Sequence, residues 1–311
     1  MHKVIAGATG LIGKQLVNHW LKQSNRVSVI GRQKEKIVNT FGNRVNALEW
    51  QELTPGIFED VDLVVNLAGA SIGEKLWSSA RKEVILKSRL DATQHLVSLL
   101  VPLGAAAPAL FNASAIGVYG LQAEATEGLP TPFDEKTPID WNAAPDFLSE
   151  VAREWEKATL PAVTSGIRVV NLRFGVVLAK DEGALPQIAR PFYFGMGGPI
   201  GSGCQPMSWV ALTDVIGAID FLSEKPEISG PVNVVAPQAV TQKAFAKALG
   251  RALHRPSFFP MPGFLFKLIL GQMADELLLR GQNVYPRRLL DVGFHFSYPD
   301  LASALASVYQ K

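Results

Sequence analysis

Three glycines at a spacing of three stand near the start of the chain, in the run VIAGATGLIG. Gly7, Gly10 and Gly13 fall between an expected buried strand and an expected amphipathic helix. In a turn of this kind, backbone N–H groups can approach a pyrophosphate, and the helix N-terminus adds partial positive charge. Thr9 can donate a hydroxyl hydrogen bond to the same group. The run therefore predicts a cradle for a dinucleotide, the alternative being a tight turn that needs glycine only for its geometry.

A basic residue follows the second expected strand, where proteins that bind NAD carry an acid. An Asp or Glu about 20 residues beyond the loop holds the ribose 2′-hydroxyl of NAD. Here Arg32 follows Gly31 directly and stands nineteen residues after Gly13 (13 to 32). A guanidinium suits a 2′-phosphate, with Lys34 or Lys36 as a second cation. The sequence therefore predicts NADP(H), and a solvated arginine after a strand is the alternative.

Two further groups fall where a dinucleotide would cross the sheet. Leu67, Ala68 and Gly69 end a central strand, and such small residues let a ligand lie in the crevice at its carboxyl end. Arg89 interrupts the apolar stripe of the helix that follows. A charge on a packed face needs a partner. That partner is either a cofactor phosphate or ribose, with Glu83 assisting, or a carboxylate in an internal salt bridge.

The elements that must position these residues alternate between short apolar runs and longer helical patterns, which is typical of a parallel sheet with helices on both faces. The expected strands are 3–7, 26–31, 45–50, 62–69, 109–115, 167–178 and 230–236. The expected helices are 13–22, 78–100, 147–159 and 212–224, and the chain turns helical again after 236. Long loops are expected over 120–145 and 192–209.

The fold class that follows is α/β, a Rossmann-type doubly wound parallel sheet with a smaller, mostly helical C-terminal substrate domain. We expect a Rossmann NADP-binding domain over 1–178, completed by about 206–236, and a small substrate domain formed by 179–205 and 237–311.

Composition limits the partners. The 311 residues include 30 Lys and Arg against 28 Asp and Glu, without a basic run, which argues against a nucleic-acid partner. The single cysteine, Cys204, excludes an intrachain disulfide, and the five scattered histidines predict no metal site. No signal peptide precedes the first strand, and no apolar run is long enough to span a bilayer. We expect a cytoplasmic protein with a small-molecule substrate and no membrane partner, and leave a homodimer open.

The chain also resembles the atypical, extended short-chain dehydrogenase/reductase superfamily, and within it the NAD(P)-dependent epimerase family typified by the bacterial YfcH protein. The resemblance runs in order from about residue 3 to residue 308, and its last part is similar to a small C-terminal domain peculiar to that family. The segments that carry it are GATGLIG, VVNLAGASIG, KEVILKSRL, SAIGVYG, VAREWEKA, LRFGVVLAKDEGAL, GMGGPIGSGCQPMSWV and GPVNVVAP.

The resemblance implies an NADP(H)-binding oxidoreductase or epimerase that transfers a hydride. Its substrate would be an unidentified small molecule, with a sugar nucleotide suggested only by analogy across the superfamily. It also adds Leu178 to the cofactor contacts, supports Arg89 as one of them, and implies that the glycine-rich loop over 192–209 lines the substrate cleft. The candidate cofactor residues are then Gly7, Thr9, Gly10, Leu11, Ile12, Gly13, Gly31, Arg32, Leu67, Ala68, Gly69, Glu83, Arg89 and Leu178.

The pattern breaks at the proton-transfer residues. Catalytic members of the superfamily use a Tyr and a Lys four residues later on one helix, with a Ser or Thr after the fifth strand. Leu148, Ala152 and Ala115 occupy these positions here, and none of them can transfer a proton. Ser114 and Tyr119 are the remaining catalytic candidates. Two functions stay open: an NADP(H)-dependent enzyme whose proton relay uses one of these residues or the glycine-rich loop, and a non-catalytic NADP(H)-binding sensor or interaction protein.

Overall fold

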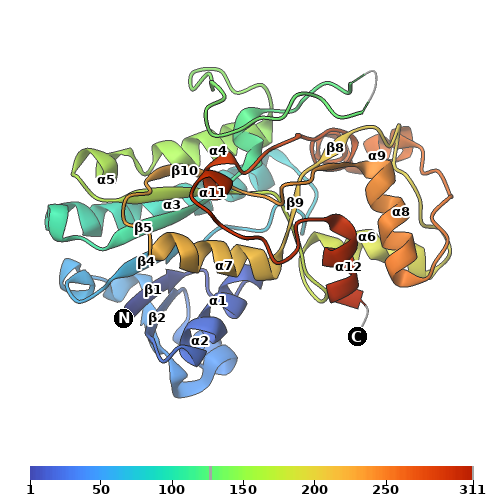
Figure 1. Cartoon of the computed structure of the whole chain (residues 1–311). Helices are drawn as coiled ribbons and strands as arrows, with labels where there is room; N and C mark the ends of the chain where they lie inside the picture. Colours follow the sequence, from blue (N-terminus) through green and yellow to red (C-terminus); the bar gives the residue numbers. More distant parts are fainter. Residues whose placement is uncertain (126–127, 310–311) are drawn as a thin grey trace.

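The computed structural model describes residues 1–125 and 128–309. Its centre is a seven-stranded parallel sheet in the order β10-β6-β5-β4-β1-β2-β3 (Figure 1). The strands are β1 (His2–Ala6), β2 (Arg26–Gly31), β3 (Asn46–Glu49), β4 (Leu63–Asn66), β5 (Ala109–Ala115), β6 (Val169–Phe174) and β10 (Gly230–Val234). The strand order reverses between β1 and β4, and ligands bind at such a switch point, outside the carboxyl ends of the strands. The predicted Rossmann-type doubly wound sheet is confirmed.

Helices cover both faces of this sheet. One face carries α1 (Leu11–Lys22), α2 (Lys34–Phe41) and α7 (Leu212–Ser223). The other carries α3 (Ser79–Leu100), α4 (Phe147–Lys157) and α5 (Leu160–Thr164). Short 3-10 turns connect them: η1 (Gly42–Arg44), η2 (Trp50–Glu52), η3 (Pro55–Phe58), η4 (Val101–Ala106) and η5 (Ile116–Tyr119).

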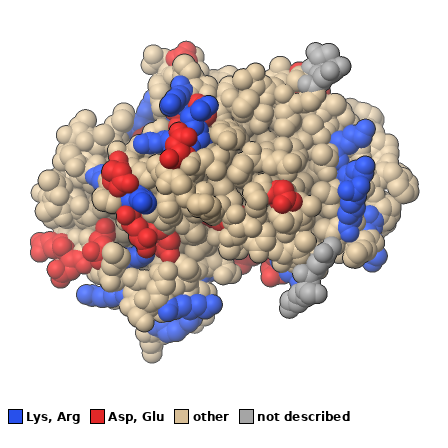
Figure 2. Space-filling view, in the orientation of Figure 1, with Lys and Arg blue, Asp and Glu red and all other residues tan. Residues whose placement is uncertain are grey.

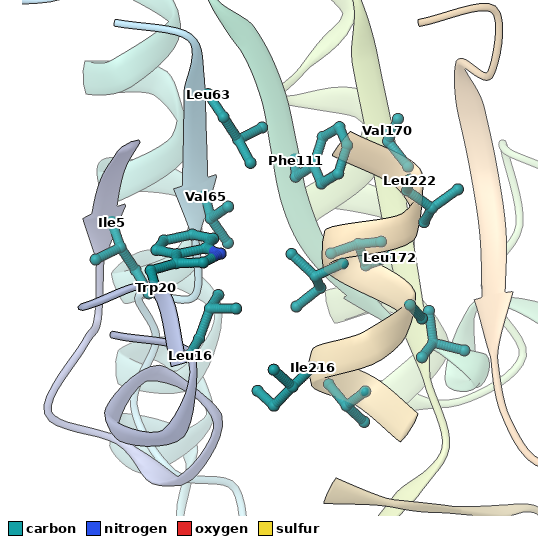
Figure 3. Packing of buried hydrophobic residues seen from close by; sticks show 14 of the residues in the cluster. Ile5, Leu16, Trp20, Leu63, Val65, Phe111, Val170, Leu172, Ile216 and Leu222 are labelled. Carbon is teal, nitrogen blue, oxygen red and sulfur yellow. The ribbon is translucent and has the colours of Figure 1, made fainter. Parts of the chain in front are cut away.

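The packing of α1 fixes the glycine loop that precedes it. Leu16 and Trp20 lie one turn apart on α1 and are fully buried against the sheet. Ile216 and Leu222 of α7 complete the same cluster, which Phe111 closes from β5 (Figure 3). Burial of each large apolar side chain contributes about 1.5–3 kcal/mol, so the start of α1 is held firmly at the carboxyl end of β1.

The strand expected over 167–178 is wrong as a single strand. It divides at Gly175, where a Cβ atom would stand 2.8 Å from Cγ1 of Val235. The chain therefore leaves the central sheet and continues as β7 (Val176–Leu178), which pairs in parallel with β9 (Trp209–Ala211). The apolar run conceals this break because both halves are rich in Val and Leu.

The C-terminal region is mostly helical, as expected. Its core packs α6, α8 and α12 around Phe192, Phe245 and Leu305. Its elements are α6 (Ala184–Tyr193), β8 (Pro206–Met207), β11 (Val240–Thr241), α8 (Gln242–Leu253), α9 (Gly263–Leu270), α10 (Gln272–Ala274), the π-helical turn η6 (Asp275–Leu279), α11 (Arg287–Asp291) and α12 (Leu301–Tyr309). Within 1–125 and 128–309, no helix is both long and apolar enough to cross a membrane.

The end of the chain returns to the loop expected over 120–145, of which Thr126 and Glu127 lie outside the described residues. Gln122 pairs with Gly281, and its N–H donates to the Gly281 carbonyl at 3.0 Å. Phe133 forms a parallel bridge with Val284, in which its N–H donates to the Asn283 carbonyl and its carbonyl accepts from the Tyr285 N–H, both at 2.8 Å. The two predicted domains, whose boundaries stay a prediction, are thus tied by backbone hydrogen bonds.

Candidate functional site

The glycine loop lies at the carboxyl end of β1, and two of its glycines leave no room for a side chain. At Gly7, where φ is +79°, a Cβ atom would stand 2.6 Å from the carbonyl carbon of Leu67. At Gly13 it would stand 2.5 Å from Cα of Ala8. Gly10 is the N-cap of α1 and supplies no side chain to cap it, so the first-turn amides can receive an anion. Thr9, Leu11 and Ile12 of this loop are half-buried.

The segment after β4 lies directly against the glycine loop, as predicted. The Leu67 N–H donates to the Ala6 carbonyl at 2.9 Å. The Ala68 N–H donates to Oδ1 of Asn66 at 3.2 Å, which turns the chain away from the sheet. Gly69 faces Arg89, whose Cγ would be 3.1 Å from a Cβ atom there. The small residues therefore bring Arg89 beside the phosphate cradle.

Arg89 meets backbone carbonyls and an aromatic ring rather than a carboxylate in the part of the chain that the structure describes. Its Nη1 donates to the carbonyls of Ala70 at 3.0 Å and Ile85 at 2.8 Å, and its guanidinium lies 4.9 Å from the ring centroid of Trp155. Among residues 1–125 and 128–309, no carboxylate comes within salt-bridge distance of it, and Nε and Nη2 have no hydrogen-bond partner. Desolvation by burial, assisted by the charge of Arg81, lowers the pKa of Arg89 to about 10, so it stays charged at neutral pH. The internal salt bridge weighed as an alternative is not formed within the described residues.

Arg32 stands exposed at the end of β2, directly after Gly31. In the described part of the chain it forms no ion pair or side-chain hydrogen bond. Lys34 differs, because its ammonium binds Glu52 and its N–H donates to Oε1 of Glu49 at 2.9 Å. Of the three cations considered for a 2′-phosphate, Lys34 is therefore already engaged by a carboxylate, whereas Arg32 and the exposed Lys36 form no ion pair in the described part of the chain.

The structure also places the three remaining predicted cofactor residues, Leu11, Leu178 and Glu83. Leu11 contacts the segment after β7, since a Cβ atom on Gly183 would be 3.0 Å from its Cδ2. Leu178 is buried at the end of β7. Glu83 is exposed on α3, six residues before Arg89, and a helix that turns about 100° per residue places the two on different faces. Glu83 and Arg89 therefore cannot form an ion pair along one face of α3.

The two catalytic candidates belong to one buried network. Ser114, at the end of β5, donates its hydroxyl hydrogen to Oε1 of Glu156 at 2.6 Å. Arg173, on β6, binds both oxygens of Glu156 at 2.8 and 2.9 Å. Although burial opposes it, the Glu156 carboxylate raises the pKa of Arg173 above its usual range. The Ser114 hydroxyl is therefore committed to a carboxylate that is itself saturated by an arginine.

Tyr119 completes that network from η5. Its hydroxyl donates to Oδ1 of Asn233 at 2.9 Å and accepts from Nη1 of Arg173 at 2.9 Å. Its ring stacks on Phe133, with centroids 5.2 Å apart. Burial raises the pKa of Tyr119 to about 12 even though the charge of Arg173 opposes the shift. A phenol in this state holds its proton at neutral pH, which weighs against the predicted relay through Tyr119.

A carboxylate from the C-terminal region occupies the start of α4, beside the position of the missing tyrosine. Glu276 of η6 is buried and accepts from the N–H of Phe147 at 3.3 Å and of Leu148 at 2.9 Å. Gln272 donates to it at 2.5 Å. These donors fit an ionised carboxylate at a helix N-terminus. Glu276 thus joins the C-terminal region to the helix that carries Leu148 and Ala152.

Sequence reasoning missed Glu156, Arg173 and Glu276. Each had a signal, because each is a charge inside an apolar or amphipathic pattern that must find a partner when buried. The partner of each charge could not be predicted, because the contacts join residues far apart in the sequence. The contact between Leu148 and Glu276, for example, spans 128 residues. Across the described residues, no group of three or more His, Cys, Asp or Glu is arranged to hold a metal ion.

Comparison with known families places this geometry among dinucleotide-binding proteins. Residues 4–235 match the model of the NAD dependent epimerase/dehydratase family, and residues 261–308 match a domain of unknown function, DUF1731. The first match covers the sheet and every candidate site residue, and the second covers α9 through most of α12.

Individual proteins resemble the whole chain. An epimerase family protein of Staphylococcus aureus is 34% identical over 310 residues, which is 99% of each chain. The crystal structure of human epimerase family protein SDR39U1 (isoform 2) with NADPH is 31% identical, with a TM-score of 0.87 and full coverage of both chains. UDP-glucuronic acid 4-epimerase from Bacillus cereus, with UDP-glucuronic acid and NAD, has a TM-score of 0.74 at 15% identity over 99% of this chain and 98% of its own, a likeness of fold alone.

Proposed function

The chain belongs to the NAD dependent epimerase/dehydratase family, and on that premise we propose that it binds NADP(H) and acts on a small molecule as an oxidoreductase or epimerase. The observation that carries the proposal is Arg32, an exposed guanidinium without a partner in the described residues, at the strand end where an acid would select NAD. The substrate class to test first is a sugar nucleotide, by analogy with proteins of the same fold.

Three groups of this chain would hold the cofactor. The close contacts of Gly7 and Gly13 leave a side-chain-free cradle at the start of α1 for the pyrophosphate. Arg32 would pair with the 2′-phosphate, and Arg89 would direct its free nitrogens to a phosphate or ribose oxygen. The human relative, which matches this chain over the full extent of both, was crystallised with NADPH, and this supports the preference.

When bound, the cofactor supplies a hydride donor or acceptor at its nicotinamide ring. The proton that must accompany a hydride cannot come from Leu148 or Ala152. Ser114 and Tyr119, our catalytic candidates, donate within the network that Glu156 and Arg173 close. If the protein turns over a substrate, the proton passes through another group of the cleft, and Glu276 is a positioning residue that holds the start of α4 against the C-terminal region.

A second candidate function is binding of NADP(H) without turnover, as a sensor or interaction protein. One observation favours it: the positions of the superfamily's proton-transfer pair carry Leu148 and Ala152, while the hydroxyls of Ser114 and Tyr119 are buried and occupied. Incubation of the NADPH-loaded and NADP-loaded protein with a panel of sugar nucleotides, followed at the absorbance of the reduced nicotinamide, separates the two. A substrate-dependent change in absorbance supports the enzyme, and so does a new sugar nucleotide separated by chromatography, because an epimerase returns its cofactor to the starting state; binding without either change supports the sensor.

The cofactor preference is tested by titrating NADP and NAD into the wild-type protein and Arg32→Ala. We expect Arg32→Ala to weaken NADP about 10- to 150-fold, because a hydrogen bond to a charged group contributes about 1.5–3 kcal/mol, and to leave NAD unchanged. Lys22→Ala, an exposed lysine in the last turn of α1 and so at the far end of that helix from the glycine loop, is the matched control and should change little. Equal affinity of the wild-type protein for NAD and NADP would overturn the assignment of Arg32.

A further inference from the structure

The most exposed apolar surface of the molecule lies in its C-terminal region, on the loop after α8 and on α9. Not one residue of α9 is buried. The exposed fractions are 79% for Phe258, 68% for Phe264, 81% for Leu268 and 68% for Ile269. Isolated exposed leucines need no explanation, but a cluster of aromatic and aliphatic side chains on one short segment does. We define Phe258, Phe259, Phe264, Leu265, Leu268 and Ile269 as the apolar tip.

A basic stripe borders the apolar tip. Lys243, Lys247 and Arg251 recur every four residues along α8, so they share one face of that helix, and all three are exposed. Arg255 follows in the loop, where its N–H donates to the Gly250 carbonyl at 2.8 Å. Figure 2 shows the lysine and arginine side chains gathered along the right-hand edge, over α8. These four cations form no ion pair within the described part of the chain.

The two features are continuous. The loop that carries Phe258 packs back on α8, since a Cβ atom on Gly250 would lie 2.6 Å from Cβ of Ser257. From residue 240 through residue 274 the sequence contains no Asp or Glu. Beneath the tip, an apolar cavity of about 270 Å³ opens between residues 259–262 and α9. One surface therefore combines exposed aromatic side chains, an apolar cavity and unbalanced positive charge.

The physical chemistry of this surface selects among occupants. A second copy of the chain, paired through the same face, would bring two acid-free basic stripes together with no counter-charge. A bilayer that contains anionic lipid can satisfy both parts of this surface. Its acyl chains can bury the Phe and Leu side chains of the apolar tip, and its negative headgroups can pair with the Lys and Arg side chains of the basic stripe. We propose that this face docks the protein on an anionic membrane surface, without crossing it.

This proposal departs from our expectation of no membrane partner. That expectation was based on the absence of a segment long enough to span a bilayer, and docking on a bilayer surface needs no such segment. It also bears on the site. The Phe259 N–H donates to the Gly197 carbonyl at 3.1 Å, and the Gly201 N–H donates to the Met261 carbonyl at 2.9 Å. The base of the tip is thus bonded to the glycine-rich loop predicted to line the substrate cleft. Docking would bring that loop to the lipid surface.

The test is co-sedimentation of the full chain with vesicles of phosphatidylcholine alone or of phosphatidylcholine mixed with phosphatidylglycerol. We expect binding only to the anionic vesicles, falling as salt is raised. Lys247→Gln with Arg251→Gln should weaken it about 30-fold, because each basic side chain near an anionic surface contributes about 5-fold. Phe258→Ser with Leu268→Ser should weaken it at least about 10-fold through lost apolar burial.

Matched controls come from other faces. Leu160→Ser with Val163→Ser removes two exposed apolar side chains from α5, and Lys87→Gln with Lys136→Gln removes two exposed cations. Both should bind as the wild-type protein does. No binding to anionic vesicles at low salt, or equal binding by the tip and control variants, overturns the proposal. So does a lipid-free dimer that Phe258→Ser with Leu268→Ser dissociates, since a second copy would then cover the tip.

Discussion

Arg89 and Arg173 are both withdrawn from water at the carboxyl ends of the central strands, and they differ in what they contact. Arg173 binds the Glu156 carboxylate with two nitrogens and the Tyr119 hydroxyl with a third contact. Arg89 binds two backbone carbonyls and meets no carboxylate within the described residues. Burial of a charge therefore does not by itself mark a ligand site. What marks it is hydrogen-bonding capacity that the fold leaves unused.

The same contrast extends to the surroundings of each arginine. Arg89 contacts the segment after β4, and the neighbouring strand ends carry two glycines whose side-chain space is filled by backbone, an uncapped helix start, and exposed Arg32. Around Arg173 every polar side chain of the network has its partner, from Ser114 to Asn233. The cofactor side of the site is open to a ligand, and the side where a proton relay was predicted is closed. Three substitutions test this difference, each on one side of it.

The largest expected effect is that of Glu156→Gln. Removing one partner of a buried ion pair leaves the other charge uncompensated, at a cost of about 3–5 kcal/mol in the free energy of unfolding measured with urea. Glu154→Gln on the same helix breaks the surface pair with Lys157 and should cost less than about 1 kcal/mol. Glu156→Met with Arg173→Met should recover much of the loss. If Glu156→Gln alone were as stable as the wild-type protein, Arg173 would have another way to compensate its charge, and the network would not be saturated as described.

Arg89→Met tests the open side and should act on binding rather than on stability. We expect NADP(H) affinity, measured by calorimetric titration, to fall about 10- to 100-fold, because a charged donor to the cofactor is lost. Unfolding free energy should change by less than about 1 kcal/mol, since no ion pair is broken. Lys87→Met, which removes an exposed cation from the same helix, is the control. A large stability loss with unchanged affinity would make Arg89 a structural residue.

The smallest effect is expected from Tyr119→Phe. Loss of the hydroxyl leaves Oδ1 of Asn233 and Nη1 of Arg173 short of one partner each, which costs about 1–2 kcal/mol in thermal or urea unfolding. Cofactor affinity should not change, and the exposed Tyr193→Phe should change neither quantity. If Tyr119→Phe abolished a measured turnover while stability and cofactor binding persisted, the predicted proton relay through Tyr119 would be restored.

The sheet could be predicted because its strands are short apolar runs bounded by turns, and β1, β2, β4 and β5 carry that pattern without ambiguity. The turn between β1 and α1, our proposed phosphate cradle, could be predicted because three glycines fall between such a strand and a helix. Several other elements could not, and two of them show why. The sequence QKEKIVNT is short and polar, so α2 leaves only Ile37 and Phe41 as its buried signal. The apolar run through Gly175 gives no sign that the chain changes sheets there.

The candidate site divides in the same way. Gly7, Gly13 and Arg32 act through their local positions, so spacing along the chain was enough to predict them. Ser114 and Tyr119 were chosen for their chemistry, and their partners Glu156, Arg173 and Asn233 come from three other elements. Spacing does not say which charges meet in a core. Whether the hydroxyls of Ser114 and Tyr119 are available for proton transfer therefore depends on tertiary contacts, which no local sequence pattern contains.

The bridges between residues 122–133 and 281–284 also set an order on synthesis. Asn233, which accepts from Tyr119, donates in turn to the Tyr285 carbonyl at 3.1 Å. A nascent chain that has emerged only as far as β10 carries all seven strands but lacks the partner that completes this hydrogen bond. The cradle for the cofactor can thus form early on the ribosome, while the loop after β5 waits for roughly the last tenth of the chain before it is held.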